Sequence, residues 1–325
     1  MKVLLTGAFG NVGLSTLTEL IKLNYYVRAF DLKTKKNQRI VNKYKNIIDV
    51  FWGDLRNFNE VLRAVKDIDV IIHLATIIPP LSEQNPKLAY EINVKGTNKL
   101  IKAANSLESK PKFIFTSSIS VFGPQMNNPP PRTSDDPVIP TDNYTEHKIK
   151  CEELIKNSGL PWTILRLAAV MPFNFDMKLA SMLFEIPLDQ RIEIISIQDV
   201  GKAIANAVKA NTLGKILLIG GGEDCKLYQK EFVKGIFGTL GIGMIPETSF
   251  RIPKKNNEWF YTDWLDTEES QKLLNYQTTT FNDYLITLKN KFGFKRHLLR
   301  SLSPIIKHYL VKTSPYYESQ KSIYV

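Results

Sequence analysis

Cysteine and histidine are scarce in this chain of 325 residues, and the scarcity excludes several classes of protein. The two cysteines, Cys151 and Cys225, lie far apart in the sequence and form no Cys-x-x-Cys pair. We therefore expect neither a disulfide framework nor a cysteine metal site, and a reducing compartment suits the chain best. The histidines show no ligand-like spacing, so we expect no metal; they are His73, His147, His297 and His308.

Long apolar runs are also missing. No stretch reaches the roughly 20 apolar residues that a membrane-spanning helix needs. The first apolar run, Val3-Leu4-Leu5, meets a glycine turn at Gly7 and leaves no room for a secretory signal. Hydrophobic residues make up 43% and charged residues 23% of the chain, which is ordinary for a globular protein. We expect a soluble, cytoplasmic protein.

The net charge of +11 is concentrated at one end of the chain. Residues 289–325 hold eight Lys or Arg and a single acid, Glu318, so this tail carries +7 of the total. A nucleic-acid-binding protein would show a patterned basic face with a recognisable motif, and we find none, so we expect no nucleic acid partner.

The tail has the pattern of a basic amphipathic helix, which Pro304 would bend. Such a helix can dock on the body of the protein or on a second subunit, or lie peripherally in a membrane interface. Its apolar positions are Leu298, Leu299, Leu302, Ile305, Ile306, Tyr309 and Leu310. The cations around them are Lys295, Arg296, Arg300, Lys307 and Lys312.

Strand-like and helix-like segments alternate through the first two thirds of the chain. This alternation predicts an α/β fold with a Rossmann-type, doubly wound parallel sheet covered on both faces. The predicted strands are Lys2–Thr6, Tyr26–Asp31, Asp49–Gly53, Asp69–Ala75, Lys112–Ser117, Trp162–Leu167 and Lys215–Gly220. The predicted helices are Leu14–Leu23, Glu60–Val65, Leu88–Leu107, Tyr144–Asn157 and Val200–Ala210.

The remaining segments predict a smaller, mixed lobe. We expect a NAD-binding Rossmann domain in residues 1–170 with 192–221, and a substrate-binding lobe in 171–191 with 222–288. The tail, 289–325, follows as a separate segment. Residues 172–187 have the composition of an insertion, and the proline-rich stretch 125–140 is typical of a loop.

A glycine-rich turn joins the first predicted strand to the first predicted helix. It reads Gly7-Ala8-Phe9-Gly10-Asn11-Val12-Gly13. Glycines let the backbone N–H groups of such a turn approach a diphosphate, which then faces the positive end of the helix dipole. The strand–turn–helix context therefore predicts a dinucleotide site, with Phe9, Asn11 and Val12 among its contacts.

Asp31 ends the second predicted strand, eighteen residues after Gly13. A carboxylate at this place can accept the ribose hydroxyls of NAD and repels the extra phosphate of NADP. Lys33, Lys35 and Lys36 lie close by and soften that discrimination. NAD is therefore the expected cofactor and NADP the less favoured one, with Leu32 beside the ribose.

The next two strands end in further candidates for the same site. Asp54-Leu55 follows the third strand, where the carboxylate can hold the adenine amino group or simply cap the turn. Leu74-Ala75-Thr76 follows the fourth, where small residues let the backbone run close to a cofactor. His73 points into the fold and is expected to be structural.

A tyrosine and a lysine lie one helical turn apart in Tyr144-Thr145-Glu146-His147-Lys148. A free phenol titrates near 10, and a neighbouring cation favours the phenolate, so the pair can form a general acid–base. The preceding strand ends in Thr116-Ser117-Ser118, from which one serine can donate to the same substrate oxygen. A second such spacing, Tyr317 to Lys321, is interpreted as accidental.

These motifs, taken in order, resemble the extended short-chain dehydrogenases/reductases of the NAD-dependent epimerase/dehydratase type, over about residues 1–290. Besides the motifs named above, the sequence contains further motifs of this family: Asn93-x-x-Gly96-Thr97, Ser118-x-x-Val121-Phe122-Gly123, Leu165-Arg166, Asp199-Val200 and Asp266-Thr267-x-x-Ser270 with Leu273-Leu274. The resemblance implies that Ser118 and Tyr144 are catalytic, that Lys148 binds the ribose, and that Asn93 and Thr116 lie near the cofactor. It also implies a homodimer through the helices Leu88–Leu107 and Tyr144–Asn157.

Two departures from the family pattern leave the substrate open. Ala169 stands where nucleotide-sugar epimerases carry an asparagine, and Arg251 either binds a substrate diphosphate or is a surface cation. Apolar residues near the site suggest a less polar small-molecule substrate: Ile77, Ile78, Met171, Phe173 and Phe175. The readings are an epimerase or dehydratase of a nucleotide sugar, a hydroxysteroid-dehydrogenase-like enzyme, and a non-catalytic dinucleotide sensor.

Overall fold

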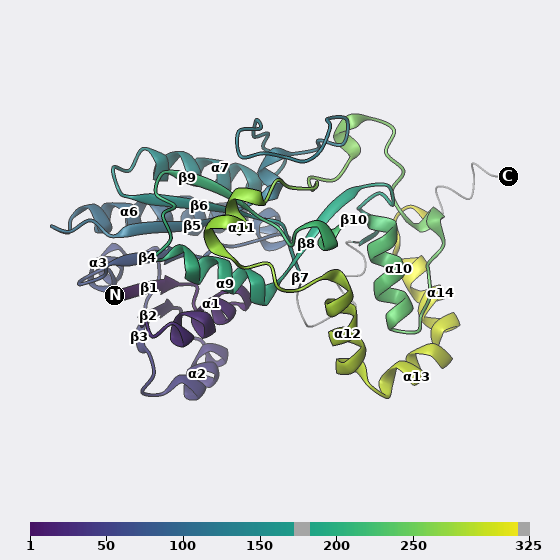
Figure 1. Ribbon diagram of the computed structural model, residues 1–325, viewed down its shortest axis with the longest axis horizontal. Helices are drawn as coiled ribbons and strands as arrows, with labels where there is room; N and C mark the ends of the chain where they lie inside the picture. The colour runs from purple at the N-terminus through teal and green to yellow at the C-terminus, as the bar shows by residue number, and fades with distance from the viewer. Residues whose placement is uncertain (172–182, 318–325) are drawn as a thin grey trace.

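The larger part of the molecule is a seven-stranded parallel sheet between two layers of helices (Figure 1). This computed structural model describes residues 1–171 and 183–317. The strand order β3-β2-β1-β4-β5-β6-β9 confirms the predicted doubly wound fold. The strands are β1 (Lys2–Thr6), β2 (Tyr26–Asp31), β3 (Asp49–Trp52), β4 (Val70–His73), β5 (Lys112–Ser118), β6 (Trp162–Leu167) and β9 (Lys215–Ile219).

Successive side chains of each central strand point to opposite helical layers, as parallel strands buried on both faces require. In β1, Val3 and Leu5 face the layer of α1 and α9, whereas Leu4 faces the layer of α3, α6 and α7. The helices with these labels are α1 (Asn11–Lys22), α9 (Ile197–Ala207), α3 (Phe58–Ala64), α6 (Thr97–Asn105) and α7 (Asn143–Lys156). Shorter helices in this part are α2 (Lys35–Val41), α4 (Leu81–Gln84), α5 (Pro86–Tyr90) and α11 (Glu268–Leu274).

A close crossing of α1 and α9 depends on Gly201. A Cβ there would lie 2.4 Å from the Ser15 hydroxyl and 2.7 Å from the Ser15 carbonyl carbon. We expect Gly201→Ala to lower the free energy of unfolding by about 1–3 kcal/mol, because the two helices must move apart. Gly238→Ala is the matched control, because a Cβ there meets nothing within 4 Å. Alanine at this helical position should raise the free energy of unfolding by about 0.5–1 kcal/mol. Urea denaturation measures both, and equal effects would contradict the account.

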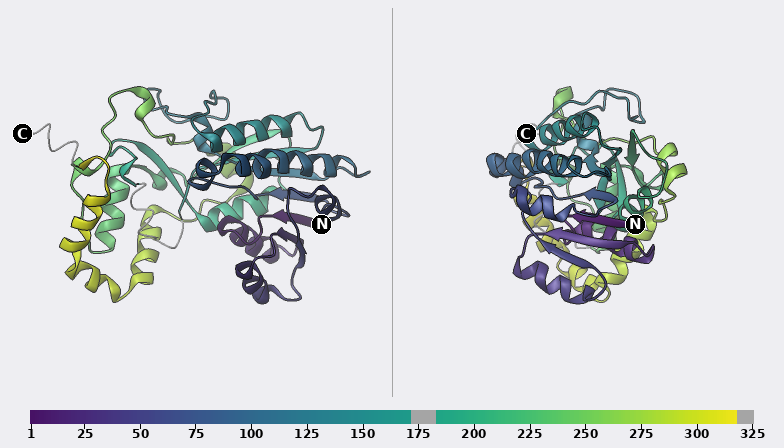
Figure 2. Two further views of the ribbon diagram at one scale, coloured as in Figure 1. Left: turned by 180° about the vertical axis from the view of Figure 1, so that it is seen from behind. Right: turned by 90° about the vertical axis from the view of Figure 1, so that its left-hand side faces the viewer.

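The smaller lobe is built on a three-stranded sheet in the order β10-β8-β7. It comprises β7 (Ala169–Met171), β8 (Arg191–Ser196) and β10 (Lys226–Tyr228), with β8 parallel to β7 and antiparallel to β10. Behind it lie α10 (Gln229–Thr239), α12 (Phe281–Phe292), α13 (Lys295–Ser301) and α14 (Ser303–Thr313), at the far end from the N-terminus (Figure 2). The predicted domain boundaries remain a prediction, but residues 192–196, assigned there to the Rossmann domain, pair within the small sheet.

Two predicted helices are interrupted in the structure. The long helix expected over Leu88–Leu107 is present from Pro86 to Asn105, but a π-helical stretch at Glu91–Gly96 divides it into α5 and α6. The tail helix breaks into α13 and α14, with Pro304 in the first turn of α14. In the described parts of the chain, no helix combines the length and apolarity needed to cross a bilayer.

Glu193 is a fully buried carboxyl where β8 meets the end of β9. It accepts backbone hydrogen bonds from Gly222 (3.1 Å) and Leu265 (2.7 Å), yet burial raises its pKa to about 7. Between the unfolded value near 4.3 and this value the folded state binds more protons, so stability falls as pH rises through this window.

We expect Glu193→Gln to remove that pH dependence. The unfolding free energy of the wild-type protein should decrease relative to the variant by roughly 3 kcal/mol between pH 4.5 and 8. Denaturation midpoints measured across this range test the expectation, and parallel pH curves for the two proteins would refute it.

Candidate active site

The glycine turn after β1 is shaped by close backbone contacts. Gly7 has a φ of +68°, and a Cβ on it would lie 2.9 Å from the backbone of Ala75. A Cβ on Gly13 would lie 2.1 Å from the Gly7 carbonyl oxygen, whereas Gly10 has more space. Among the described residues, no side chain caps the first turn of α1, so its N–H groups at Asn11 and Val12 remain available to an anion.

Asp31 ties the glycine turn to the end of β2. Its carboxylate accepts hydrogen bonds from the backbone N–H of Phe9 (2.9 Å) and of Leu32 (2.8 Å), and from the Asn37 amide (3.2 Å). Burial raises the pKa of Asp31, and these hydrogen bonds counteract the rise. The residue therefore supports the turn as well as bordering the pocket.

A pocket of about 340 Å³ opens at the carboxyl ends of β1, β2, β3 and β4, where the strand order reverses. In open α/β sheets this switch point is where ligands bind. Predicted residues that line it are Gly7, Phe9, Gly10, Asp31, Leu32, Asp54, Leu55, Leu74, Ala75 and Thr76. Lining residues outside the predicted set are Phe30, Lys36, Asn37, Gly53, Ile77 and Ile92.

The Asp54 carboxylate is already paired with a neighbouring side chain, which competes with the predicted adenine contact. It is paired with the Arg56 guanidinium at 2.6–3.1 Å and accepts the Arg56 backbone N–H at 2.9 Å. The hydrogen bonds from Arg56 hold the pKa of Asp54 below its usual range. The turn-capping role is thus realised in the structure, whereas the adenine contact remains a prediction.

Asp31 should set the preference between the two dinucleotides. We expect Asp31→Asn to lower the ratio of the NADP to the NAD dissociation constant by about tenfold or more, roughly 1.4 kcal/mol, because a phosphate no longer meets a carboxylate. Asp67→Asn, an exposed position at the opposite end of the sheet, is the control. Calorimetric titration measures both ratios, and an unchanged ratio in Asp31→Asn would remove the assigned role.

Ser118 and Tyr144 meet beyond the end of β5. The Tyr144 phenol lies near the Ser118 side chain, which influences its pKa. Burial raises the pKa of Tyr144 to about 12, and the Ser118 side chain counteracts this rise. The Ser118 oxygen also accepts from the Ser120 hydroxyl (2.8 Å), while the hydroxyl of Ser117 is buried without a partner among the described residues.

Lys148 lies beneath Tyr144 on the same face of α7. Its ammonium donates to the Thr116 carbonyl at 2.7 Å and is 5.6 Å from the centre of the Tyr144 ring. Burial lowers the pKa of Lys148 to about 8. The cation is therefore fixed close to the phenol, and Thr116 positions it through its backbone.

The N-terminus of α7, which carries Tyr144, is held by two carboxylates. Asp142 forms a capping box with Thr145, accepting its N–H at 2.7 Å. Glu83, on α4, accepts from the Asn143 backbone (3.1 Å) and amide (2.6 Å) and from the Tyr144 N–H (3.3 Å). Glu83 thereby fixes the start of the helix, and its position in the sequence carries no motif that could have revealed it.

Asn93 and His73 position backbone segments near the site. The Asn93 amide exchanges two hydrogen bonds with the backbone of Ile77, at 2.7 and 2.9 Å, and so fixes the loop after β4. His73 lies between the hydroxyls of Thr6 (2.7 Å) and Thr97 (2.9 Å). Burial lowers the pKa of His73 to about 3, which keeps the ring neutral.

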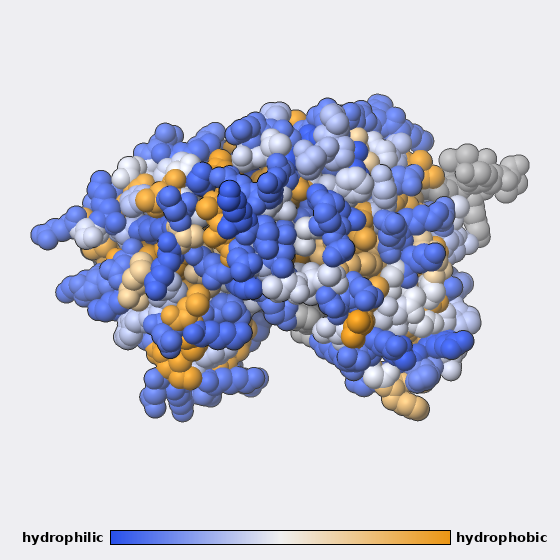
Figure 3. Space-filling model, in the orientation of Figure 1, coloured by the Kyte–Doolittle hydropathy of each residue, from blue (hydrophilic) through white to orange (hydrophobic). Residues whose placement is uncertain are grey.

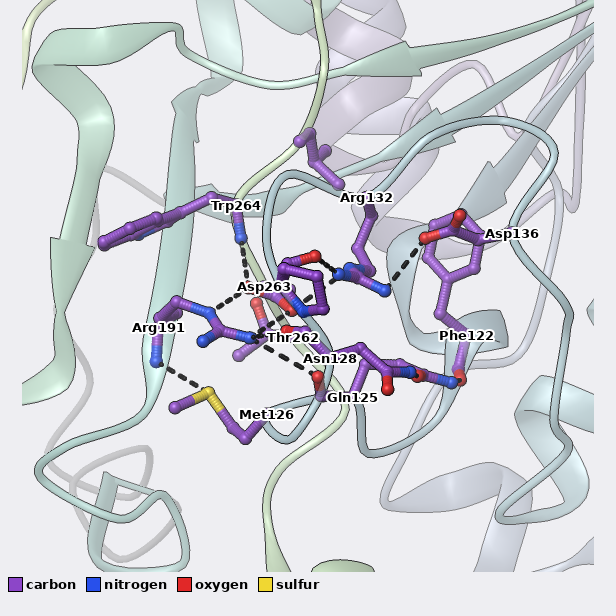
Figure 4. Close-up of polar contacts among 12 residues, drawn as sticks. Phe122, Gln125, Met126, Asn128, Arg132, Asp136, Arg191, Thr262, Asp263 and Trp264 are labelled. Atoms are coloured by element: carbon purple, nitrogen blue, oxygen red, sulfur yellow. Dashed lines mark hydrogen bonds and ion pairs between the residues drawn. The ribbon is translucent and has the colours of Figure 1, made fainter.

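A buried polar cluster joins the loop after the Ser118 segment to the lobe (Figure 4). Asp263 pairs with Arg191 on β8 at 2.6 Å and with Arg132 in the loop at 3.3 Å. Arg132 also pairs with Asp136 at 3.0 Å, so the four charges balance. Arg191 reaches the Gln125 carbonyl, and the Gln125 amide bonds Phe122, four residues after Ser118.

Arg251, the candidate for a substrate diphosphate, is engaged within the lobe. It is ion-paired with Glu185, donates to the Tyr316 hydroxyl at 2.9 Å and contacts the Glu258 carbonyl at 3.3 Å. Of the apolar residues expected around the substrate, Ile77 lines the cofactor pocket and Ile78 is exposed. Phe173 and Phe175 lie outside the described residues.

Comparison with known proteins gives matches over the same regions. Residues 4–160 match the model of the 3-beta hydroxysteroid dehydrogenase/isomerase family. The chain is 29% identical over 173 residues to UDP-glucose 4-epimerase of Lactobacillus helveticus, covering 51% of each protein. It is 30% identical over 175 residues to the mouse (Mus musculus) decarboxylating sterol-4-alpha-carboxylate 3-dehydrogenase, covering 53% of this chain and 45% of that protein.

Similarity to solved structures extends over nearly the whole fold. UDP-glucuronic acid 4-epimerase from Bacillus cereus, solved with UDP-glucuronic acid and NAD, aligns with a TM-score of 0.72 at 22% identity. The alignment covers 92% of this chain and 100% of that one. These matches agree with the resemblance seen in the motifs, and the solved structure shares the fold of this chain. The chain spans about half the length of the curated relatives it matches.

Proposed function

We propose that the protein is a NAD-dependent oxidoreductase that transfers a hydride at an alcohol or carbonyl carbon of a small molecule. The observation that carries the proposal is the grouping of Ser118, Tyr144 and Lys148 at the end of β5, with the Lys148 ammonium held by the Thr116 carbonyl and 5.6 Å from the Tyr144 ring, next to the pocket of the glycine turn. This arrangement combines an acid–base group with a cofactor site at one edge of the sheet.

The pocket has the features that a dinucleotide needs. The spaces at Gly7 and Gly13 admit no side chain, and the free N–H groups at the start of α1 suit a diphosphate. Asp31 would accept ribose hydroxyls, and Lys148 would bind the second ribose. When bound, NAD supplies the acceptor or donor of the hydride.

Tyr144 is the proton carrier in this proposal. In the oxidation direction the substrate carbon loses a hydride, and the hydroxyl proton passes to the Tyr144 phenolate as the carbonyl forms. Ser118 donates a hydrogen bond to the same substrate oxygen. Burial alone opposes the phenolate, as the pKa of about 12 indicates, so the charge of Lys148 is needed to stabilise it.

The lobe favours a substrate that is less polar than a nucleotide sugar. Both of its arginines discussed above are already paired, Arg191 with Asp263 and Arg251 with Glu185. A diphosphate would have to compete with these carboxylates. The likeness to a UDP-glucose 4-epimerase favours the other reading, an epimerase or dehydratase of a nucleotide sugar.

Absorbance at the nicotinamide band distinguishes these readings. With NAD present, a 3β-hydroxysteroid and UDP-glucose are offered separately, and steady accumulation of NADH with the steroid supports the less polar substrate. UDP-galactose formed from UDP-glucose without net NADH would support the epimerase. NAD binding without turnover of either compound would favour a non-catalytic dinucleotide sensor over both enzymes.

The family resemblance also leads us to propose a homodimer that pairs through α6 and α7. A shallow groove between them is lined by Tyr90, Val94, Ile101 and Leu154, among other residues. Sedimentation equilibrium tests this assembly, and a monomer at all concentrations would rule it out.

A further inference from the structure

The basic tail uses only one face to pack against the lobe. Leu310 and Val311 of α14 are buried in the same core cluster as Phe237 of α10. The Ser303 hydroxyl donates to the Ile242 carbonyl at 2.6 Å, and the Ser314 hydroxyl bonds the Ser249 carbonyl. The tail is therefore a folded part of the lobe, which fixes which of its side chains face outward.

A row of large apolar side chains remains on the outer face. Phe294, Leu298, Leu302, Ile305 and Tyr309 are 86%, 60%, 39%, 68% and 61% exposed. Within α13 and its end, Leu298 and Leu302 are one turn apart, and within α14 Ile305 and Tyr309 are one turn apart, so each helix contributes an exposed apolar pair to the strip. The strip crosses the bend because Leu302 donates to the Leu298 carbonyl and accepts from Ile306, both at 3.0 Å.

The charge around this strip has a single sign. No Asp or Glu occurs between Tyr284 and Tyr317, whereas this stretch contains seven Lys or Arg. Lys295 and Lys312 are exposed near the apolar strip, and Arg300 is exposed on the side of α13 that faces Gly241. Figure 3 shows the result at the tip of the lobe, where apolar groups at α13 are surrounded by hydrophilic ones.

We propose that this strip docks the protein on an anionic lipid surface, with the apolar row in the acyl boundary and the cations at the headgroups. The combination of exposed aromatic and aliphatic side chains with unmixed positive charge is what an interfacial helix needs. A second copy of this chain is a poorer occupant, because symmetric pairing would bring two acid-free basic faces together.

A cavity on the flank of α14 adds a place for a headgroup. Its volume is about 640 Å³, and its lining includes Lys307, His308 and Lys312. Lys312 thus belongs both to the rim of the apolar strip and to this cavity. An anionic headgroup seated there would neutralise the cations while its chains follow the apolar row.

Vesicle co-sedimentation of the full-length protein tests the proposal. We expect at least about tenfold stronger partitioning onto vesicles of phosphatidylcholine with phosphatidylglycerol than onto phosphatidylcholine alone, and weaker partitioning at high salt. The triple variant Phe294→Ser, Leu298→Ser, Ile305→Ser should reduce partitioning by at least about tenfold. These side chains are exposed, so the variant should fold as the wild type does.

Two further variants make the test specific. Leu23→Ser, Ile47→Ser, Leu213→Ser removes comparably exposed apolar groups from the nucleotide-binding part and should leave partitioning unchanged. Lys295→Gln, Arg300→Gln, Lys312→Gln should abolish the preference for anionic vesicles. Absence of binding to anionic vesicles, or full binding by the tail triple variant, would overturn the proposal. Self-association that the tail variant abolishes would also overturn it, by showing that a second copy covers the strip.

Discussion

Tyr144→Phe is expected to lower kcat by about 10²–10⁴-fold while leaving the dissociation constant of NAD within about threefold of the wild-type value. The variant removes one oxygen, the one proposed to exchange a proton with the substrate, and keeps the ring, whose centre lies 5.6 Å from the Lys148 ammonium. Steady-state kinetics, with the substrate that the nicotinamide-absorbance assay identifies, measure kcat. Calorimetric titration measures the dissociation constant of NAD.

Tyr317→Phe is the control for this prediction, because Tyr317 begins the other Tyr-x-x-x-Lys sequence of the chain. It lies beside the cavity of the tail and far from the glycine turn, so its kcat should equal that of the wild type. If Tyr144→Phe retained full activity, Tyr144 would not be the acid–base and the enzymatic proposal would lose its main support.

Asp263→Asn is expected to lower the free energy of unfolding by about 3–5 kcal/mol, because two buried guanidiniums would lose their shared counter-charge. Arg132 and Arg191 both depend on Asp263, and only Asp136 would remain to balance them. All three residues of the shared contact are buried, so solvent cannot replace the lost carboxylate.

Asp135→Asn provides the comparison, since this exposed carboxylate lies in the same loop as Arg132 and the change in net charge is identical. This substitution should change the free energy of unfolding, measured by urea denaturation, by no more than about 0.5 kcal/mol. A loss below about 1 kcal/mol in Asp263→Asn would mean that the buried cluster contributes little to stability.

The parts of the fold that follow local patterns were predictable. The strands at Tyr26–Asp31 and Trp162–Leu167 have the predicted bounds, because short, mostly apolar segments that alternate with helical ones mark buried parallel strands. The glycine turn was recognisable for a similar reason: Gly7 and Gly13 occupy positions where a side chain would meet backbone atoms. Such features depend on residues that are neighbours in the sequence, so the sequence alone can reveal them.

The contacts that assemble the site across long distances in the chain were not predictable. Glu83 binds the start of α7 sixty residues later, and Arg132 meets Asp263 only because the lobe folds back over the loop. An isolated acid or arginine carries no sign of its partner in one sequence. The cofactor role of Asn93 remains a prediction, and its hydrogen bonds to the Ile77 backbone were not foreseen.

The apolar side chains of the tail lie on two different faces of its helices. Helical spacing alone left docking on the body and contact with a membrane as alternatives, since every turn carries apolar side chains. The structure separates these side chains into an inner set, with Leu310 and Val311, and an outer set, with Ile305 and Tyr309. One face of the tail therefore docks on the body of the protein, and the opposite face makes the proposed lipid contact.

Calorimetric titration of the full-length protein with NAD tests the central claim most directly, because every proposed role depends on a dinucleotide at the glycine turn. The account predicts saturable binding of one NAD per chain, with NADP bound at least about tenfold more weakly. Absence of binding to either dinucleotide at millimolar concentration, by a protein shown to be folded, would contradict the account.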